Sequence, residues 1–151
     1  MAERSQSGTQ DSSSTGRQVA ILIDADVLIA DERGVFDLNS WLLARQKERV
    51  EIAAITASEL WHGLERASGA RKVKRRNYIE NALAVFPVIP FTGLTAQIHA
   101  HLWAGLESSG KMIGYHDLIV AATAIERGSA VATFNLRHFS AVKGLKVIEP
   151  K

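Results

Sequence analysis

Four side chains with oxygen ligands, Asp24, Glu59, Asp117 and Asn135, stand beside apolar segments of the sequence. Three of them are carboxylates, which repel one another when a fold brings them together. A hard divalent cation with oxygen ligands, typically Mg²⁺ or Mn²⁺, is the usual means of relieving that repulsion. Such a cation also lowers the pKa of a bound water and neutralises charge on a phosphoryl group. If the four side chains converge, the chemistry to expect is metal-dependent hydrolysis of a phosphodiester.

Short β-branched segments that alternate with amphipathic helices are the elements that must position these side chains. We predict strands over residues 19–23, 50–55, 86–91, 130–134 and 145–149. Strands separated by helices are joined by crossovers, so the sequence predicts a three-layer α/β/α fold with a mostly parallel central sheet. Ligands bind at the carboxyl ends of the strands in such sheets. Asp24 ends the first strand, Glu59 follows the second by one helical turn, and Asn135 follows the fourth.

Apolar residues at helical spacing predict the helices between these strands. The stripes comprise Leu94, Ile98, Leu102 and Leu106; Leu118, Ala122 and Ile125; and Tyr78, Ile79, Ala82, Leu83 and Phe86. Asp117 stands near the start of the helix that contains the second stripe. Pro87 and Pro90 cannot donate backbone hydrogen bonds, so the segment 86–91 is predicted to be an edge strand or a connecting loop.

Each candidate residue also has an ordinary structural role. Glu59 completes a capping box with Thr56 as the N-cap of a helix. Asp117 is a first-turn acid, which the positive end of a helix favours, and Asn135 is a common turn or cap residue. Asp24 is the hardest to explain in this way, because a carboxylate directly after an apolar run is partly buried and costly without a partner.

The histidines and tryptophans give weaker signals. We expect His116 to be a hydrogen-bonded bystander, and His138 to pack against or cap its own helical turn. The tryptophans lie in apolar helical stripes, which predicts core or dimer-surface positions for Trp41, Trp61 and Trp103.

Composition excludes several classes of protein. The 151 residues are 46% hydrophobic, enough for one domain with a buried core. The absence of cysteine excludes a disulfide framework, a thiolate zinc site and a cysteine nucleophile. No segment approaches the roughly 18 uninterrupted apolar residues of a membrane span, and no secretory signal is visible, so we expect a cytoplasmic protein. Residues 1–17 are mostly Ser, Gln, Thr and Gly, which predicts a disordered tail before a domain over residues 18–151.

The positive charge is concentrated in one segment, residues 66–76, which reads RASGARKVKRR. It holds six of the 18 basic residues and no acid, and the rest of the chain is left with 12 basic against 16 acidic residues. Such a run is typical either of a contact with a polyanion or of the solvated face of a helix. Together with the acids, it favours nucleic acid as the phosphodiester.

Several short motifs in a fixed order resemble one known family. They are Asp24 followed by Val27-Leu28-Ile29, T-x-S-E-L over residues 56–60, Asp117 followed by Ile119 and Ala121-Ala122, and T-x-N-x-x-H-F over residues 133–139 followed by Gly144-Leu145-x-Val147. Together they resemble the PIN-domain ribonucleases, above all the VapC toxins of bacterial toxin–antitoxin pairs. The resemblance covers residues 18–150 and is specific in combination, although each motif is short.

The resemblance implies a PIN-like fold and an endoribonuclease that cuts RNA with Mg²⁺ or Mn²⁺. Asp24 and Asp117 would be the direct metal ligands, and Glu59 would complete the acidic set. Asn135 falls where many relatives carry a fourth acid, and Thr133 would lie beside the cluster as a supporting hydroxyl. Family members usually form homodimers and are silenced by a cognate antitoxin. The basic run at residues 71–76 would then meet either RNA phosphates or an acidic stretch of the antitoxin.

One departure from the family pattern opens a different interpretation. The family usually has Ser, Thr or Asn two positions after the first aspartate, whereas this chain has Asp26. We expect Asp26 to start the following helix as a cap, with membership of the metal shell as the alternative. The string ILIDADVLI also resembles the D-x-D-x-[TV] element of haloacid-dehalogenase-type phosphatases, but Leu28 stands where that pattern has Thr or Val. A third possibility is a PIN-like module that binds RNA or an antitoxin without cutting.

Overall fold

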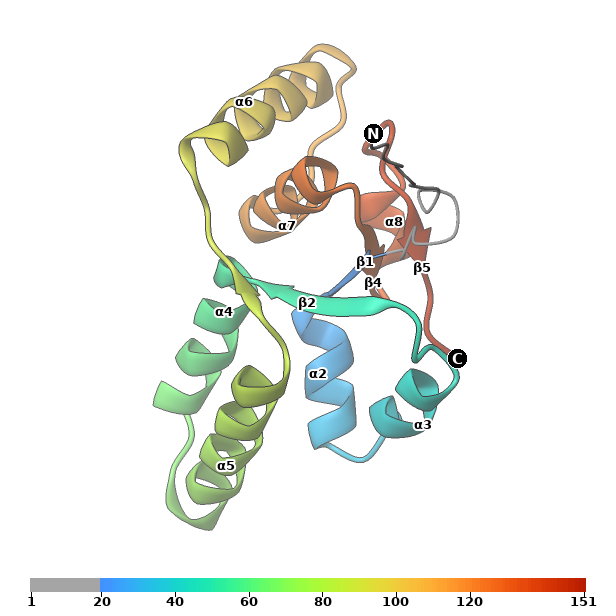
Figure 1. The fold of residues 1–151 in the computed structure, drawn as a ribbon. Coiled ribbons are helices and arrows are strands. Elements are labelled where there is room, and N and C mark those ends of the chain that lie inside the picture. The colour runs from blue at the N-terminus through green and yellow to red at the C-terminus, as the bar shows by residue number, and fades with distance from the viewer. Residues whose placement is uncertain (1–19) are drawn as a thin grey trace, which may run out of the picture.

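Five short strands form one parallel sheet at the centre of the computed structural model, which describes residues 20–151 (Figure 1). The predicted disordered tail over residues 1–17 lies outside the described residues. The strands are β1 (Ala20–Ile23), β2 (Arg49–Ala53), β3 (Val88–Ile89), β4 (Ala130–Ala132) and β5 (Val147–Ile148). Their order is β3-β2-β1-β4-β5, and every neighbouring pair is parallel. The predicted α/β fold with a parallel central sheet is therefore confirmed.

The strands are shorter than the apolar runs that predicted them. Ile55 was expected in the second strand but lies in a helix, because that helix begins directly after β2 with no connecting loop. Likewise Thr133 and Phe134 lie beyond the end of β4. The proline-containing segment 86–91 contributes only the two residues of β3, at one edge of the sheet, as its prolines predict.

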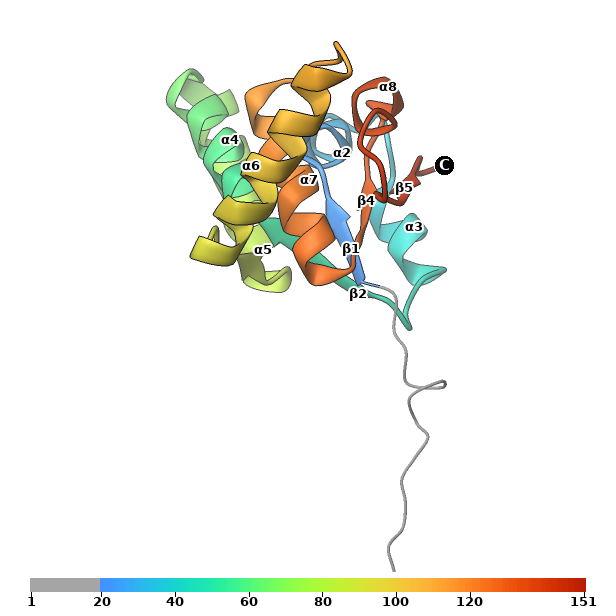
Figure 2. The same ribbon diagram turned by 90° about the horizontal axis from the view of Figure 1, so that it is seen from above.

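Helices cover both faces of the sheet (Figures 1 and 2). They are α2 (Ala25–Glu32), α3 (Leu38–Leu43), α4 (Ala54–Glu65), α5 (Gly69–Val85), α6 (Gly93–Ser108), α7 (Tyr115–Arg127) and α8 (Leu136–Phe139). The helical stripe expected at Trp41 corresponds to the short helix α3, where Trp41 is buried. The four-residue helix α8 was not predicted, since it is too short to show an apolar stripe. No helix among residues 20–151 is both long enough and apolar enough to span a membrane.

Alternation along the central strands divides the core into two layers. Ile21 and Ile23 of β1 point to the face packed by α2, α3, α4 and α5, whereas Leu22 points to the face packed by α7 and α8. Each of these three side chains is fully buried. This period-two alternation accounts for the three-layer architecture, because one strand supplies apolar side chains to both helical layers.

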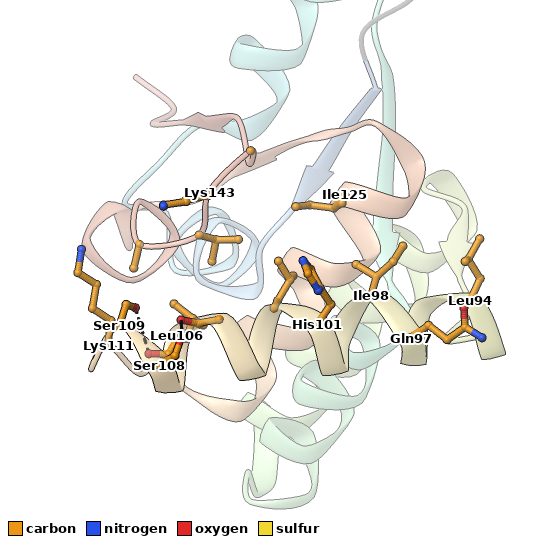
Figure 3. A pocket seen from close by; sticks show the side chains of 15 residues that line it. Leu94, Gln97, Ile98, His101, Leu106, Ser108, Ser109, Lys111, Ile125 and Lys143 are labelled. Atoms are coloured by element: carbon orange, nitrogen blue, oxygen red, sulfur yellow. Dashed lines mark hydrogen bonds between the residues drawn. The ribbon is translucent and has the colours of Figure 1, made fainter.

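Helix α6 lies outside α7 and covers it incompletely (Figure 2). Its predicted apolar stripe is buried at Leu106, but Leu94 at the other end is 55% exposed. Thr95 is buried instead, because it forms a capping box with Thr92 and donates a hydrogen bond to Glu126 of α7. All four residues of the stripe line a groove of about 850 Å³ between α6, α7 and residues 141–144 (Figure 3).

Candidate active site at the carboxyl edge of the sheet

Asp24 lies at the point where the strand order reverses. Strands β2 and β3 extend to one side of β1 and strands β4 and β5 to the other, so the residues after β1 and β4 face the crevice where ligands bind in such sheets. The Asp24 backbone N–H donates to the Ala132 carbonyl at 2.9 Å, which fixes the carboxylate beside the end of β4. Only 5% of Asp24 is exposed.

The Asp24 carboxylate is held by one neighbour on each oxygen. Its Oδ1 accepts a 2.9 Å hydrogen bond from the Ala25 N–H, which makes Asp24 the N-cap of α2. Its Oδ2 accepts a 2.8 Å hydrogen bond from the Thr133 hydroxyl. Thr133 therefore contacts the acid directly, as the family resemblance implied for a supporting hydroxyl.

Asp26 does not cap the helix, so the capping role expected for it is wrong. The cap position is already filled by Asp24, and Asp26 reaches across to the segment after β4. There its Oδ2 accepts hydrogen bonds from the Phe134 backbone N–H at 3.1 Å and from the Thr133 hydroxyl at 3.3 Å. Asp26 thus joins the same cluster as Asp24, as a carboxylate that ties α2 to this segment.

Asp117 lies in the first turn of α7 and meets two side chains of the α8 segment. Its Oδ2 is 3.3 Å from the Asn135 Nδ2 and 3.0 Å from the His138 Nδ1. Asn135 also donates its backbone N–H to the Thr133 hydroxyl at 2.9 Å, so it bridges the Asp24 and Asp117 parts of the site. Although it occupies the N-cap position of α8, its side chain makes no capping hydrogen bond. The amide instead contacts Asp117 and His138.

Glu59 has no capping role. The N-cap of α4 is Ala53, and Thr56 lies buried inside the helix, so the predicted capping box is wrong. The Glu59 Oε2 lies 3.4 Å from the His116 Nδ1. Its Oε1 is buried and has no hydrogen-bond partner within residues 20–151. A buried carboxylate oxygen without a partner is costly, which makes Glu59 available for a ligand.

The pKa values of the acids depend on one another, because their carboxylates lie in one region. These acids are Asp24, Asp26, Glu59 and Asp117. Burial raises the pKa of Asp24 to about 7, and the negative charges of Asp26 and Asp117 contribute to that rise. Burial is also the main cause that raises the pKa of Asp26 and of Glu59, and Asp117 adds to both. Hydrogen bonds from Phe134 and Thr133 oppose the rise at Asp26, as His116 does at Glu59. Among the described residues, no Lys or Arg forms an ion pair with any of these acids.

The donor set fits a hard divalent cation in its chemistry. The acids offer carboxylate oxygens, the ligand type that Mg²⁺ and Mn²⁺ prefer, and burial together with their mutual repulsion raises the pKa of Asp24. The buried, unpartnered Oε1 of Glu59 is a further vacant acceptor. Over the described part of the chain, no three acidic or histidine side chains are gathered as tightly as a ready-made metal site requires. The carboxylate oxygens thus match a hard divalent cation in donor type and in charge, while their spacing is wider than that of a ready-made site.

Two histidines belong to this region although the sequence did not indicate it. His138 was expected to pack against or cap its own turn, but it faces Asp117. His116 was expected to be a bystander, and it is the partner of Glu59. His138 lies three residues after Asn135, so one helical turn of α8 presents both side chains to Asp117. This spacing, which is part of the T-x-N-x-x-H-F motif over residues 133–139, is the sequence signal that could have predicted the contact.

Comparisons with known proteins agree with this architecture. The PIN domain family model matches residues 21–145. Ribonuclease VapC1 of Rickettsia felis is 30% identical over 131 residues, which are 86% of this chain and 96% of that protein. Ribonuclease VapC10 of Mycobacterium tuberculosis is 34% identical over 127 residues, or 83% and 90% of the two chains.

Solved structures have the same fold. FitAcB from Neisseria gonorrhoeae is similar with a TM-score of 0.73 and 27% identity, covering 86% of this chain and 97% of that one. The toxin–antitoxin structure VapBC-5 from Mycobacterium tuberculosis is similar with a TM-score of 0.69 and 27% identity, covering 87% and 98%. With the family model, the relatives and the fold in agreement, the chain belongs to the PIN-domain family and, within it, to the VapC ribonucleases.

Proposed function

We propose that this protein is a metal-dependent endoribonuclease, a VapC-type toxin that cleaves RNA and is neutralised by a cognate antitoxin. The observation that carries the proposal is the buried Asp24 carboxylate at the switch point of the sheet, surrounded by further acids and by no Lys or Arg among the described residues. Family membership supports RNA as the substrate.

In this proposal Asp24 and Asp117 hold Mg²⁺ or Mn²⁺ directly, and Glu59 and Asn135 complete the catalytic set. The bound cation supplies a more acidic water and neutralises charge on the scissile phosphate. The free Oε1 of Glu59 can accept a hydrogen bond from the attacking water and orient it. Thr133 and Asn135 hold the carboxylates of Asp24 and Asp117 in place, which keeps their oxygens directed at one region.

An antitoxin partner is supported by the relatives whose solved structures are toxin–antitoxin complexes. The acid cluster lacks an Arg or Lys partner within residues 20–151, so a basic side chain of an antitoxin is complementary to it. We also propose that the protein forms a homodimer and acts in the cytoplasm, where its RNA substrate is found.

The basic run on α5 is the second surface of the proposed function. Arg75 is already paired with Glu32 at 3.2 Å, so it is not available to a partner in the way that its exposed neighbours Arg71, Lys74 and Arg76 are. If these three side chains contact RNA phosphates, reversing their charge weakens RNA binding and reduces its dependence on salt. An unchanged salt dependence counts against a contact between this run and RNA phosphates.

The test is cleavage of total cellular RNA by purified, antitoxin-free protein in Mg²⁺, in Mn²⁺ and in EDTA. We expect cutting in either metal, none in EDTA, and none from Asp24→Asn or Asp117→Asn. Asp37→Asn is the matched control, because Asp37 is an exposed acid that caps α3. Asp26→Asn shows whether Asp26 changes the metal preference.

The two alternatives predict other results. A non-catalytic PIN-like module binds RNA or antitoxin but cuts nothing in either metal. A haloacid-dehalogenase-type phosphatase hydrolyses a small phosphate ester and leaves RNA intact, but membership of the PIN-domain family argues against it. Folded wild-type protein that cuts no RNA refutes the proposed function.

A further inference from the structure

The groove of about 850 Å³ beside α6 is separate from the acid cluster, since none of the four acids lines it. One side of the groove is the apolar stripe of α6, and Ile125 of α7 and the segment 141–144 form the other side (Figure 3). Leu94 is 55% exposed, although Leu106 at the other end of the stripe is buried. A contiguous apolar surface that stays open to solvent indicates an interaction site.

The positive charge in the groove is concentrated at one end. Lys111 and Lys143 lie toward the end where α6 finishes, whereas Leu94 lies at the opposite end (Figure 3). Neither lysine forms an ion pair within residues 20–151, and no Asp or Glu of those residues lines the groove. The neighbouring hydroxyls of Ser108 and Ser109 already donate to carbonyls of α6. This end of the groove is therefore complementary to carboxylates of a partner.

The volume of the groove matches one face of a helix. The stripe from Leu94 to Leu106 is about 18 Å long at about 1.5 Å per residue. A helix about 10 Å across and of that length occupies roughly 1400 Å³, so half of it requires roughly 700 Å³. A single extended chain about 5 Å wide requires only roughly 350 Å³ over the same length. The groove of about 850 Å³ therefore suits a helix that buries one face better than an extended chain.

Helix polarity determines the direction in which such a helix binds. The last turn of α6 carries partial negative charge on its carbonyls, and Lys111 and Lys143 offset it. A helix that runs antiparallel to α6 brings the partial positive charge of its first turn to the same place. Acidic side chains are also most favourable in the first turn of a helix. Both effects favour an antiparallel helix whose first-turn acids meet the two lysines.

We propose that this groove binds an amphipathic helix of a partner protein, antiparallel to α6, with acidic residues in its first turn. Those acids pair with Lys111 and Lys143. The apolar residues of the helix pack along Leu102, Ile98 and Leu94, and their burial supplies the affinity. The lysines select the charge and the direction of the helix. The site does not depend on the proposed ribonuclease function, and its occupation leaves the acid cluster accessible.

The probe is a labelled amphipathic peptide of about 16 residues, with leucines at helical spacing and glutamates in its first turn. A second peptide has lysines in place of the glutamates. Binding to the full chain is measured by fluorescence anisotropy. We expect wild type to bind the glutamate peptide at least about tenfold more tightly than the lysine peptide. The double variant Lys111→Glu, Lys143→Glu should invert this preference, because it reverses the charge at that end.

Leu94→Asp tests the apolar end of the groove, with Val85→Asp as the matched control. Leu94 is 55% exposed and Val85 is 70% exposed, so neither replacement introduces a charge into the core. Val85 is the last residue of α5 and does not line the groove. We expect Leu94→Asp to weaken binding of the glutamate peptide at least about fivefold, and Val85→Asp to leave it unchanged.

Four results with the peptides overturn the inference. They are no binding of either peptide at millimolar concentration, equal binding of both, a preference that the double variant retains, and an equal loss in Leu94→Asp and Val85→Asp. A dimer that light scattering detects in wild type but not in Leu94→Asp also overturns it, because a second copy of the chain then fills the groove.

Cleavage of total RNA in Mg²⁺ is measured with and without saturating glutamate peptide. Undiminished cutting supports a docking site apart from the acids, whereas inhibition overturns that separation. Absence of cutting without peptide refutes the proposed function alone, since the peptide preferences are measured independently of it.

Discussion

Replacing Asp24 by Asn is expected to stabilise the metal-free protein at alkaline pH although it abolishes the proposed activity. Burial and the neighbouring acids raise the pKa of Asp24 from its ordinary value of 3.8 to about 7. At 1.36 kcal/mol for each pKa unit, the charged carboxylate costs the folded state about 4 kcal/mol. Asn is neutral and nearly isosteric, and it can still accept from Ala25 and donate to the Thr133 hydroxyl.

The sign of the pH dependence follows from the direction of the shift. Between pH 3.8 and about 7 the folded protein binds more protons than the unfolded chain, so the stability of wild type falls as the pH rises through this window. The gain in stability of Asp24→Asn over wild type is therefore absent below about pH 4 and complete above about pH 8. Added Mg²⁺ reduces the advantage, because the proposed ion binds the charged carboxylate of wild type.

Urea unfolding followed by circular dichroism at pH 4, 6 and 8, in EDTA and in Mg²⁺, measures this difference. Asp37→Asn is the control of opposite sign, because hydrogen bonds from Ser40 lower the pKa of Asp37. Replacing the charged Asp37 carboxylate therefore lowers the stability of the folded protein at pH 8. This loss disappears at low pH, where the carboxylate of wild type is protonated. The reasoning is refuted if Asp24→Asn is no more stable than wild type at pH 8 in EDTA.

Three further substitutions test other parts of the structure. The buried Glu51 carboxylate accepts a hydrogen bond from the Arg127 Nε at 3.0 Å, and Arg127→Met removes this main partner. The substitution should lower the free energy of unfolding in urea by about 3 kcal/mol, because it leaves the buried charge unpaired. An unchanged value would show that the pair contributes nothing net. Thr56→Val removes a buried hydroxyl that has no partner in the described residues. It should raise the free energy of unfolding in urea by about 1 kcal/mol. A lower free energy of unfolding would show that the hydroxyl has a hydrogen-bond partner after all. His138→Ala removes a neighbour of Asp117 and should raise the Mg²⁺ concentration for half-maximal RNA cleavage about 10- to 100-fold, whereas an unchanged metal titration would make His138 a bystander.

The sheet and its functional edge could be predicted from the sequence because both depend on local patterns. Short β-branched runs separated by helical stripes require parallel crossovers, and the polar residues that follow such strands must share one edge. This reasoning groups Asp24, Glu59 and Asn135, whereas Asp117 follows no strand and is a candidate because it lies near the start of an apolar helix.

The details that could not be predicted depend on where elements begin and on contacts between distant residues. The capping box at Thr56 failed because α4 begins directly after β2, so the strand end rather than the local motif determines the cap. The cap predicted at Asp26 failed because Asp24 occupies that position. The contact of His138 with Asp117 depends on the placement of the four-residue helix α8, which has no periodic signal. The buried stripe predicted for α6 is incomplete, because its first residue, Leu94, is exposed while the neighbouring Thr95 is buried.

The placement of β1 between β2 and β4 has a consequence during synthesis of the chain. Asp24 is translated before Thr133 and Asn135, which contact Asp24 and Asp117 and follow β4. Thr133 lies 109 residues after Asp24 in the chain. Until β4 pairs with β1, the early acids have no fixed geometry. A growing chain on the ribosome is therefore expected to leave the RNA around it intact until β4 and the residues that follow it have been translated.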